Sequence, residues 1–172
     1  MADTIDVLIS EEKINARIKE LAESIDHDYA GKEIIFLCTL KGACFFACEL
    51  AKRVTLPVFM EFIQAKSYEG KNSTGNLVMK LDVPEEAIAG KHVIIIEDVI
   101  DTGRTLSHVK QLMLDRNPAS IAVCSLLDKH ECRVVPFEGE YIGFSIGDDF
   151  VVGYGLDWDQ KYRNLPYVGI VR

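Results

Sequence analysis

The chain has 172 residues, 48% of them hydrophobic and 27% charged, which is typical of a globular protein and fits a single domain over residues 1–172. Its formal net charge of −8 argues against broad binding to nucleic acids or anionic membranes, which requires a basic face. A small anionic ligand stays possible, because a few N–H groups, one cationic side chain and a metal ion reverse the local sign.

Targeting signals and disulfides are not expected. The N-terminal MADTIDVLIS carries acids where a signal peptide would be basic, and no apolar run reaches membrane-spanning length. The five cysteines are odd in number, lie mostly in apolar stretches and form no CxxC motif. Free thiols in a reducing compartment are therefore expected, which predicts a cytoplasmic protein.

Helical and strand patterns alternate along the chain. Ser10 is placed to cap a first helix, whose apolar residues recur at helical spacing until Gly31 offers a stop. Further helices are expected over 41–54 and 104–117, and strands over 33–40, 57–65, 76–82, 91–97 and 119–128. The segment KSYEGKNSTG (66–75) is polar and lacks an apolar period, which predicts a mobile loop.

The strands are the informative elements for the fold class. EIIFLCTL (33–40) and KHVIIIE (91–97) are nearly continuous apolar runs, which is typical of strands covered on both faces. Their alternation with helices predicts an α/β fold with a parallel sheet. The C-terminal third contains only short strands and turns, and we expect it to form a small flap over this sheet.

The segment HVIIIEDVIDTGRTL (92–106) carries the chemistry. An apolar strand ends in Glu97 and Asp98, at the carboxyl edge where parallel sheets bind ligands. Two adjacent carboxylates indicate a magnesium ion or sugar hydroxyls. The following DTGRT (101–105) offers backbone N–H groups, hydroxyls and a helix N-terminus, a cradle suited to phosphate. Together these features predict a site for a phosphorylated sugar.

A plainer interpretation makes Asp101 or Thr102 the N-cap of the next helix. Capping accounts for one acid or hydroxyl, but it does not account for Glu97 and Asp98 as well. The two familiar phosphate motifs GxxxxGK[ST] and GxGxxG are absent from the sequence.

The stretch IIIEDVIDTGRTL resembles the phosphoribosyl-diphosphate-binding motif of type I phosphoribosyltransferases. Four other segments resemble one branch of that family, the hypoxanthine-guanine phosphoribosyltransferases: TLKGACFF (39–46), KSYEGKNSTG (66–75), LLDK (126–129) and DDFVVGYGLDWDQKYRNLPYVG (148–169). The resemblance implies a type I phosphoribosyltransferase-like parallel sheet flanked by helices. It also implies a small hood from the chain ends and a mobile lid loop.

The resemblance implies that phosphoribosyl diphosphate is bound by Lys41, Gly42, Glu97, Asp98, Thr102, Gly103, Arg104, Thr105 and Arg163. Within this set, residues 102–105 would wrap the 5′-phosphate, while Lys41 and Gly42 would face pyrophosphate beside an unusual peptide bond. The acids at 97 and 98 would hold the ribose hydroxyls, directly or through Mg²⁺. The implied metal ligands are Glu97, Asp98 and Asp157.

For the purine, the resemblance makes Asp101 the general base that takes the N7 proton. Phe150 would stack on the ring, and the backbone of Val151 together with Lys129 would read its edge. Taken singly, Lys129 and Lys41 would be ordinary surface lysines and Phe150 a core residue.

The lid would bring Ser67 and Tyr68 over the reacting centre. The chain departs from the family pattern at Ala43, where Ser or Thr is frequent, and at Trp158, where Tyr is frequent. The lid also looks short. These departures bear on loop dynamics and purine preference more than on the reaction.

The chemistry agrees with this resemblance. Breaking the C1′–O bond leaves a cationic ribose and a highly charged leaving group, which magnesium and cationic side chains stabilise. A lid excludes water, and a carboxylate base near N7 contributes about 10²–10⁴-fold. We expect transfer of phosphoribose from 5-phosphoribosyl 1-diphosphate to hypoxanthine or guanine, giving IMP or GMP and pyrophosphate.

Xanthine is an alternative base that the sequence does not rank. A nucleotide-sensing regulator of RNA or DNA would show a basic face and would not need the catalytic base or the lid. A sugar-phosphate phosphatase would not need the lysine, aromatic and lid segments together. The resemblance implies a homodimer or homotetramer, and neither a nucleic acid nor a membrane is expected as a partner.

Overall fold

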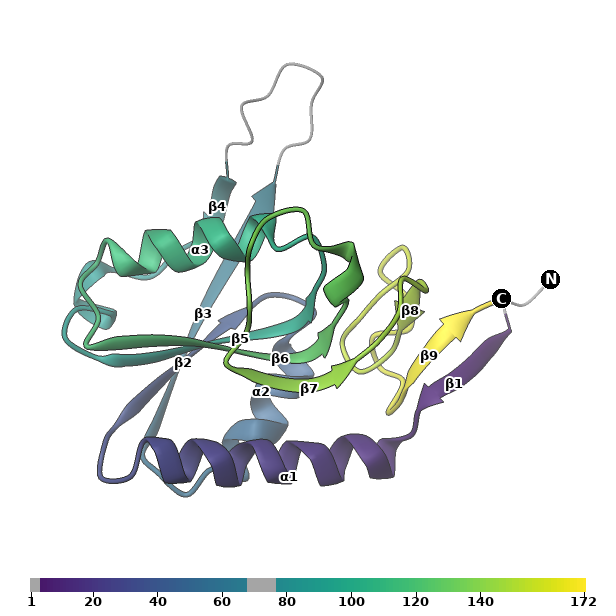
Figure 1. Cartoon of the computed structure of the whole chain (residues 1–172), viewed down its shortest axis with the longest axis horizontal. Helices are drawn as coiled ribbons and strands as arrows, with labels where there is room; N and C mark the ends of the chain where they lie inside the picture. The colour runs from purple at the N-terminus through teal and green to yellow at the C-terminus, as the bar shows by residue number, and fades with distance from the viewer. Residues whose placement is uncertain (1–3, 68–76) are drawn as a thin grey trace, which may run out of the picture.

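The computed structural model describes residues 4–67 and 77–172, and its centre is a six-stranded sheet (Figure 1). The strand order β4-β3-β2-β5-β6-β7 is formed by β2 (Ile34–Thr39), β3 (Val58–Ser67), β4 (Leu77–Leu81), β5 (His92–Ile100), β6 (Ser120–Asp128) and β7 (Tyr141–Ser145). All neighbouring strands are parallel except β3 and β4, which pair antiparallel. The expected α/β fold with a mainly parallel sheet is confirmed.

Each face of the sheet carries a hydrophobic core. Helices α1 (Glu11–Asp28) and α2 (Cys44–Ala51) cover one face, and α3 (Arg104–Leu114) covers the other (Figure 1). Successive strand residues point to opposite faces, so Ile94 and Ile96 belong to the first core and Ile95 to the second. Because both faces are covered, the central strands read as unbroken apolar runs in the sequence.

The register of the central strands sets the position of the loops that follow them. β2 and β5 pair from Ile34 opposite His92 to Cys38 opposite Ile96. The residues after both strands therefore emerge side by side at the carboxyl edge of the sheet. The edge strand β4 and the short 3₁₀ helices η1 (Glu85–Ala87) and η2 (His130–Cys132) lie outside this central pair.

A second, three-stranded sheet forms the hood. It consists of β1 (Ile5–Ile9), β9 (Val168–Val171) and β8 (Val151–Val152), with both neighbouring pairs antiparallel. Figure 1 shows β1 and β9 side by side, which joins the two ends of the chain. The sequence pattern does not predict β1, because three of its five residues are exposed and its partner is the last strand.

Some element boundaries differ from the sequence-based expectations. The first helix is confirmed, since the Ser10 side chain accepts a hydrogen bond from the Lys13 N–H at 3.4 Å. The helix expected over 41–54 spans only Cys44–Ala51, because a turn occupies the residues before it. Residue 67 ends β3, so the expected loop begins later than residue 66, and residues 68–76 lie outside the described part of the chain.

All five cysteines are free, as expected; Cys38 and Cys124 are buried, Cys44 and Cys132 are half-buried, and Cys48 is exposed. Among the described residues, no helix is long and apolar enough to cross a membrane.

Candidate active site

The carboxyl edge of the sheet contains a hollow of about 280 Å³, here called the acidic hollow. The predicted site residues that line it are Lys41, Gly42, Glu97, Asp98, Thr105, Asp157 and Arg163. They come from the loop after β2, the end of β5, the first turn of α3 and the segment after β8. Segments that the sequence separates by more than a hundred residues therefore converge here.

The two adjacent acids remain inside β5, which extends to Ile100 and not to residue 97 as expected. Burial and the neighbouring Asp98 charge raise the pKa of Glu97 well above its usual range. Within the part of the chain that the structure describes, no basic side chain forms an ion pair with either acid. A divalent cation or sugar hydroxyls would offset this charge, so both residues fit a magnesium site.

The loop after β2 approaches these acids closely. The Thr39 hydroxyl donates to the Ile96 carbonyl at 2.9 Å, and the Leu40–Lys41 peptide bond is cis, as the resemblance implied. A Cβ on Gly42 would lie 1.6 Å from Asp98 Oδ2, so no side chain fits there. Glycine at this position lets the loop backbone reach the acidic hollow.

The segment after β8 supplies the far wall. Arg163 Nη2 lies 2.7 Å from Asp157 Oδ1, and Arg163 Nη1 donates to the Gly155 carbonyl at 2.7 Å. Lys41 Nζ donates to Gln160 Oε1 at 3.1 Å, which joins the two walls. Asp157 also accepts from the Gln160 N–H at 2.8 Å, so a metal ion at Asp157 would compete with these contacts.

The turn after β5 encloses a second, smaller hollow of about 130 Å³, here called the turn hollow. Its predicted site residues are Glu97, Asp101, Thr102, Gly103 and Thr105. The N-cap of α3 is Gly103, in the left-handed conformation, so capping by Asp101 or Thr102 is wrong as an explanation. The Arg104 N–H lies 3.4 Å from Thr102 Oγ1, a long contact, and the helix N-terminus faces a site suited to an anion. Arg104 itself is exposed and lines neither hollow.

Among the predicted purine residues, Lys129 contacts Ile100, which lines the turn hollow. The Lys129 N–H donates to the Ile100 carbonyl at 2.9 Å, and its Nζ donates to the Asp149 carbonyl at 2.8 Å. Phe150 is 57% exposed and meets Trp158 edge-on, so the core interpretation of this aromatic is wrong. Val151 is buried in the hood sheet.

The predicted lid residues are Ser67 and Tyr68. Ser67 is the last residue of β3, and the structure does not describe its side chain, while Tyr68 lies outside the described residues.

Two site neighbours carry no sequence signal. Burial and the nearby carboxylate of Asp101 raise the pKa of the Cys132 thiol. Arg133 donates to the Asp101 carbonyl at 2.6 Å. Neither residue belongs to a recognisable motif, and only the fold of η2 brings them to the end of β5.

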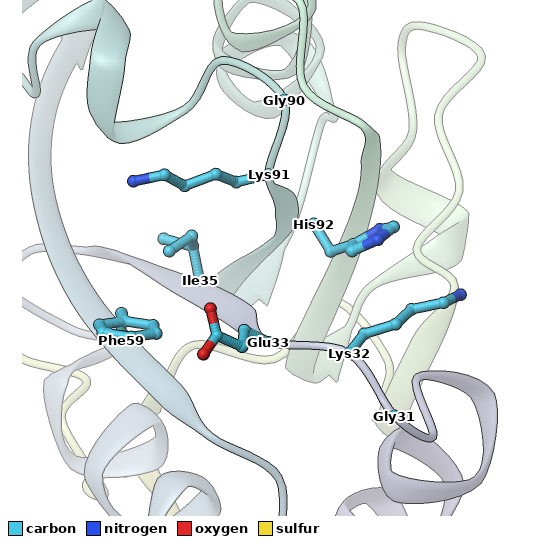
Figure 2. Close-up of a pocket in the computed structure, with 8 residues that line it drawn as sticks. All are labelled: Gly31, Lys32, Glu33, Ile35, Phe59, Gly90, Lys91 and His92. Atoms are coloured by element: carbon cyan, nitrogen blue, oxygen red, sulfur yellow. The ribbon is translucent and has the colours of Figure 1, made fainter.

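A separate hollow of about 400 Å³ lies at the opposite edge of the sheet and is here called the amino-edge hollow (Figure 2). It is lined by Gly31, Lys32, Glu33, Ile35, Phe59, Gly90, Lys91 and His92. None of the predicted site residues lines it. Figure 2 shows that its charged side chains extend from the beginnings of strands, not from their carboxyl ends.

Comparison with known proteins places the chain in a family. Residues 7–159 match the phosphoribosyl transferase domain. The hypoxanthine phosphoribosyltransferase of Salmonella typhimurium is 44% identical over 173 residues, covering 99% of this chain and 97% of that protein. The hypoxanthine-guanine phosphoribosyltransferase of Streptococcus thermophilus is 42% identical, with 96% and 92% covered. A crystal structure of a hypoxanthine-guanine phosphoribosyltransferase from Bacillus anthracis superposes with a TM-score of 0.93, at 42% identity and with 98% and 100% covered. This chain therefore belongs to the phosphoribosyltransferase family, among the hypoxanthine and hypoxanthine-guanine phosphoribosyltransferases.

Proposed function

We propose that this chain is a purine salvage enzyme that transfers phosphoribose from 5-phosphoribosyl 1-diphosphate to hypoxanthine or guanine. The products are IMP or GMP and pyrophosphate. One observation carries the proposal. Glu97 and Asp98 lie between the loop that contains Lys41 and the N-terminus of α3, and neither acid has a basic partner among the described residues. The curated relatives named above support the same reaction.

The phosphoribosyl diphosphate would span the two hollows. Residues 102–105 bind the 5′-phosphate through the N-terminus of α3 and their hydroxyls. Glu97 and Asp98 accept hydrogen bonds from the ribose hydroxyls. Lys41 and Arg163 face the pyrophosphate across the acidic hollow. When bound at Glu97, Asp98 or Asp157, Mg²⁺ supplies positive charge that stabilises the leaving group.

The purine would lie against Phe150, with Lys129 and the Val151 backbone at its edge. Asp101 accepts the N7 proton, which raises the nucleophilicity of the base as the bond to C1′ forms. The ring of Phe150 is 57% exposed, so its face is free to stack on a base, which supports this role. Xanthine is the alternative base, since Lys129 recognises an oxo group that all three purines share.

The remaining features of the proposal concern the molecule as a whole. We propose that residues 1–172 form one domain that works in the cytoplasm as a homodimer or homotetramer, without a nucleic-acid or membrane partner. The net charge of −8 supports the last point. Sedimentation of the purified chain would measure its assembly state.

The test incubates the chain with 5-phosphoribosyl 1-diphosphate, Mg²⁺ and each 6-oxopurine separately, and follows nucleotide formation. We expect turnover with hypoxanthine, guanine or both. Chelation of the metal should abolish turnover, and added Mg²⁺ should restore it. Absence of turnover with all three bases would refute the proposed reaction, and turnover that resists chelation would refute the role of magnesium.

A further inference from the structure

We propose that Arg133 is a positioning residue. Its guanidinium holds the backbone of the general base, Asp101, next to the backbone of the purine-reading lysine, Lys129. This inference rests on the proposed function, because it assigns Arg133 a task in that reaction. Arg133 lies just after η2, and its side chain is only 10% exposed although it reaches the candidate active site.

One terminal nitrogen of Arg133 contacts both catalytic segments. Nη1 donates to the Asp101 carbonyl at 2.6 Å and to the Ile100 carbonyl at 3.0 Å. The same nitrogen lies 3.4 Å from the Lys129 carbonyl. Asp101 follows the last residue of β5, so its carbonyl lies beyond the strand and is held by this guanidinium. The backbone of the proposed base is therefore tied to the backbone of the proposed purine-reading lysine.

The rest of the guanidinium is anchored away from the substrate. Nε donates to the Phe137 carbonyl at 2.9 Å, and Nη2 pairs with the buried carboxylate of Asp128. A planar guanidinium presents its donors in a rigid fork, so anchors on two sides fix the direction of Nη1. Because the side chains of Arg133 and Asp128 are almost fully buried, the low local dielectric strengthens these hydrogen bonds.

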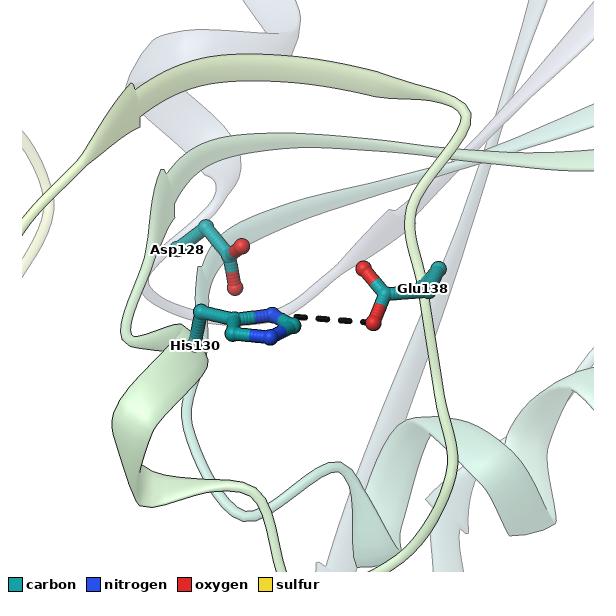
Figure 3. A group of neighbouring side chains, drawn as sticks. All are labelled: Asp128, His130 and Glu138. Atoms are coloured by element: carbon teal, nitrogen blue, oxygen red, sulfur yellow. Dashed lines mark ion pairs between the residues drawn. The ribbon is translucent and has the colours of Figure 1, made fainter.

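Asp128 belongs to a group of ligand-type side chains with His130 and Glu138 (Figure 3). His130 and Glu138 approach each other at 3.6 Å on the surface, whereas Asp128 is buried and paired with Arg133. The guanidinium already neutralises the buried acid. We therefore assign Asp128 to orienting Arg133 and not to binding a metal ion.

The aliphatic part of Arg133 has a separate contact with the phosphate turn. A Cβ built on Gly103 would lie 3.3 Å from Arg133 Cδ, so the side-chain stem packs against this glycine. The next residue, Val134, donates its N–H to the Thr102 carbonyl at 3.1 Å. A substitution that keeps the stem and removes the guanidinium should therefore spare phosphate binding and disturb the purine side.

The test uses the double variant Arg133→Met with Asp128→Asn. Methionine keeps an unbranched stem, and asparagine avoids a buried unpaired carboxylate, which would destabilise the fold. We expect kcat to fall by at least about tenfold, because small displacements of a reacting group cost large factors in rate. The KM for the purine should rise by about tenfold or more, and the KM for phosphoribosyl diphosphate should stay within about twofold of its original value.

A matched control is the double variant Arg116→Met with Asp82→Asn. Arg116 is 15% exposed, pairs with Asp82 at 2.6 Å and donates to the Val83 carbonyl at 2.6 Å, so it has a similar environment away from both hollows. Its replacement should lower the melting temperature and leave kcat and both KM values unchanged. The single variant Arg133→Lys keeps the charge but lacks the forked donors of the guanidinium. Relative to the Arg133→Met double variant, it should restore the melting temperature more fully than the KM for the purine.

The two KM values separate positioning from stability. A purely structural role would reduce the fraction of active molecules, which lowers kcat and moves neither KM. Unchanged KM values in the Arg133 variant, or equal rises in both, would overturn the inference while the unaltered chain remains active. If the unaltered chain turns over no purine, the proposed function fails, and the inference fails with it.

Discussion

The two edges of the central sheet both carry charged residues, a hollow and an exposed aromatic ring, yet they differ in one physical property. At the amino edge, Lys32, Glu33 and Lys91 are exposed, and water screens their charges. At the carboxyl edge, Glu97 and the adjacent Asp98 are both partly buried, and burial together with the charge of Asp98 raises the pKa of Glu97. The partial burial of two like charges, not the presence of charge, distinguishes the two edges.

Size and aromatic exposure do not separate the two edges. The amino-edge hollow has a volume of about 400 Å³, and the acidic and turn hollows at the carboxyl edge have volumes of about 280 Å³ and about 130 Å³. Phe59 at the amino edge is 53% exposed, nearly as much as Phe150 at 57%. Two partly buried carboxylates side by side cost free energy until a ligand or cation offsets their charge. That cost favours the carboxyl edge as the candidate active site.

The strongest test of the difference between the two sheet edges is Asp101→Asn at the carboxyl edge. This substitution removes the proposed base and preserves the shape of the side chain. We expect turnover to fall by about 10²–10⁴-fold, because general base catalysis contributes that range. Binding of phosphoribosyl diphosphate should change little, since the backbone of the phosphate turn is unaltered. Steady-state kinetics combined with equilibrium binding of phosphoribosyl diphosphate would measure both quantities.

Asp115→Asn is the control for this substitution, because Asp115 is exposed just after the end of the same helix, α3. It should leave turnover unchanged. An Asp101→Asn variant that keeps full activity would show that another group takes the proton.

The sequence was sufficient for the parts of the molecule that depend on local pattern. The apolar runs predicted the central strands, and Glu97 and Asp98 predicted a candidate site at the carboxyl edge, because strand polarity follows from the α/β pattern. The family resemblance supplied what local pattern lacked, such as the cis peptide bond before Lys41.

The parts that were missed depend on contacts between distant segments. β1 pairs only with the last strand, so no sequence pattern near residues 5–9 predicts it. Arg133 is one of many arginines in the sequence, and its task follows from five acceptors that the fold gathers around it. Residue type alone would also have placed Phe150 in the core, whereas the family resemblance placed it against the purine, which fits its exposure.

A smaller effect is expected from replacing the exposed aromatic ring at each edge. Phe150→Leu should raise the KM for the purine by about tenfold, because stacking of a base on an aromatic side chain is worth roughly 1–3 kcal/mol. Phe59→Leu removes an equally exposed ring at the amino edge and should leave the KM unchanged. Initial rates at varied purine concentration would measure the difference.

Equal effects of these two substitutions would contradict the comparison of the edges, since exposure alone would then account for both. A rise in the KM for phosphoribosyl diphosphate with Phe150→Leu would place the ring nearer the acidic hollow than proposed.

The smallest expected effect concerns stability and follows from the raised pKa of Glu97. Folding favours the protonated carboxyl, so the stability from this group is fully present below the ordinary pKa of 4.5. It is lost as the pH rises through the higher pKa of the folded chain. Glu97→Gln removes this titration and should make metal-free protein more stable at neutral pH, by about 2–4 °C in melting temperature for each kcal/mol recovered.

Melting curves between pH 4.5 and pH 8 would measure this difference in the absence of magnesium. The unaltered chain should lose melting temperature more steeply with rising pH than the Glu97→Gln variant, and Glu33→Gln at the amino edge should follow the unaltered chain. Added Mg²⁺ should narrow the gap, because a bound cation stabilises the ionised acid that folding otherwise disfavours. Parallel curves for all three proteins would mean that the carboxylates are not held at a free-energy cost. The physical basis for distinguishing the two edges would then be lost.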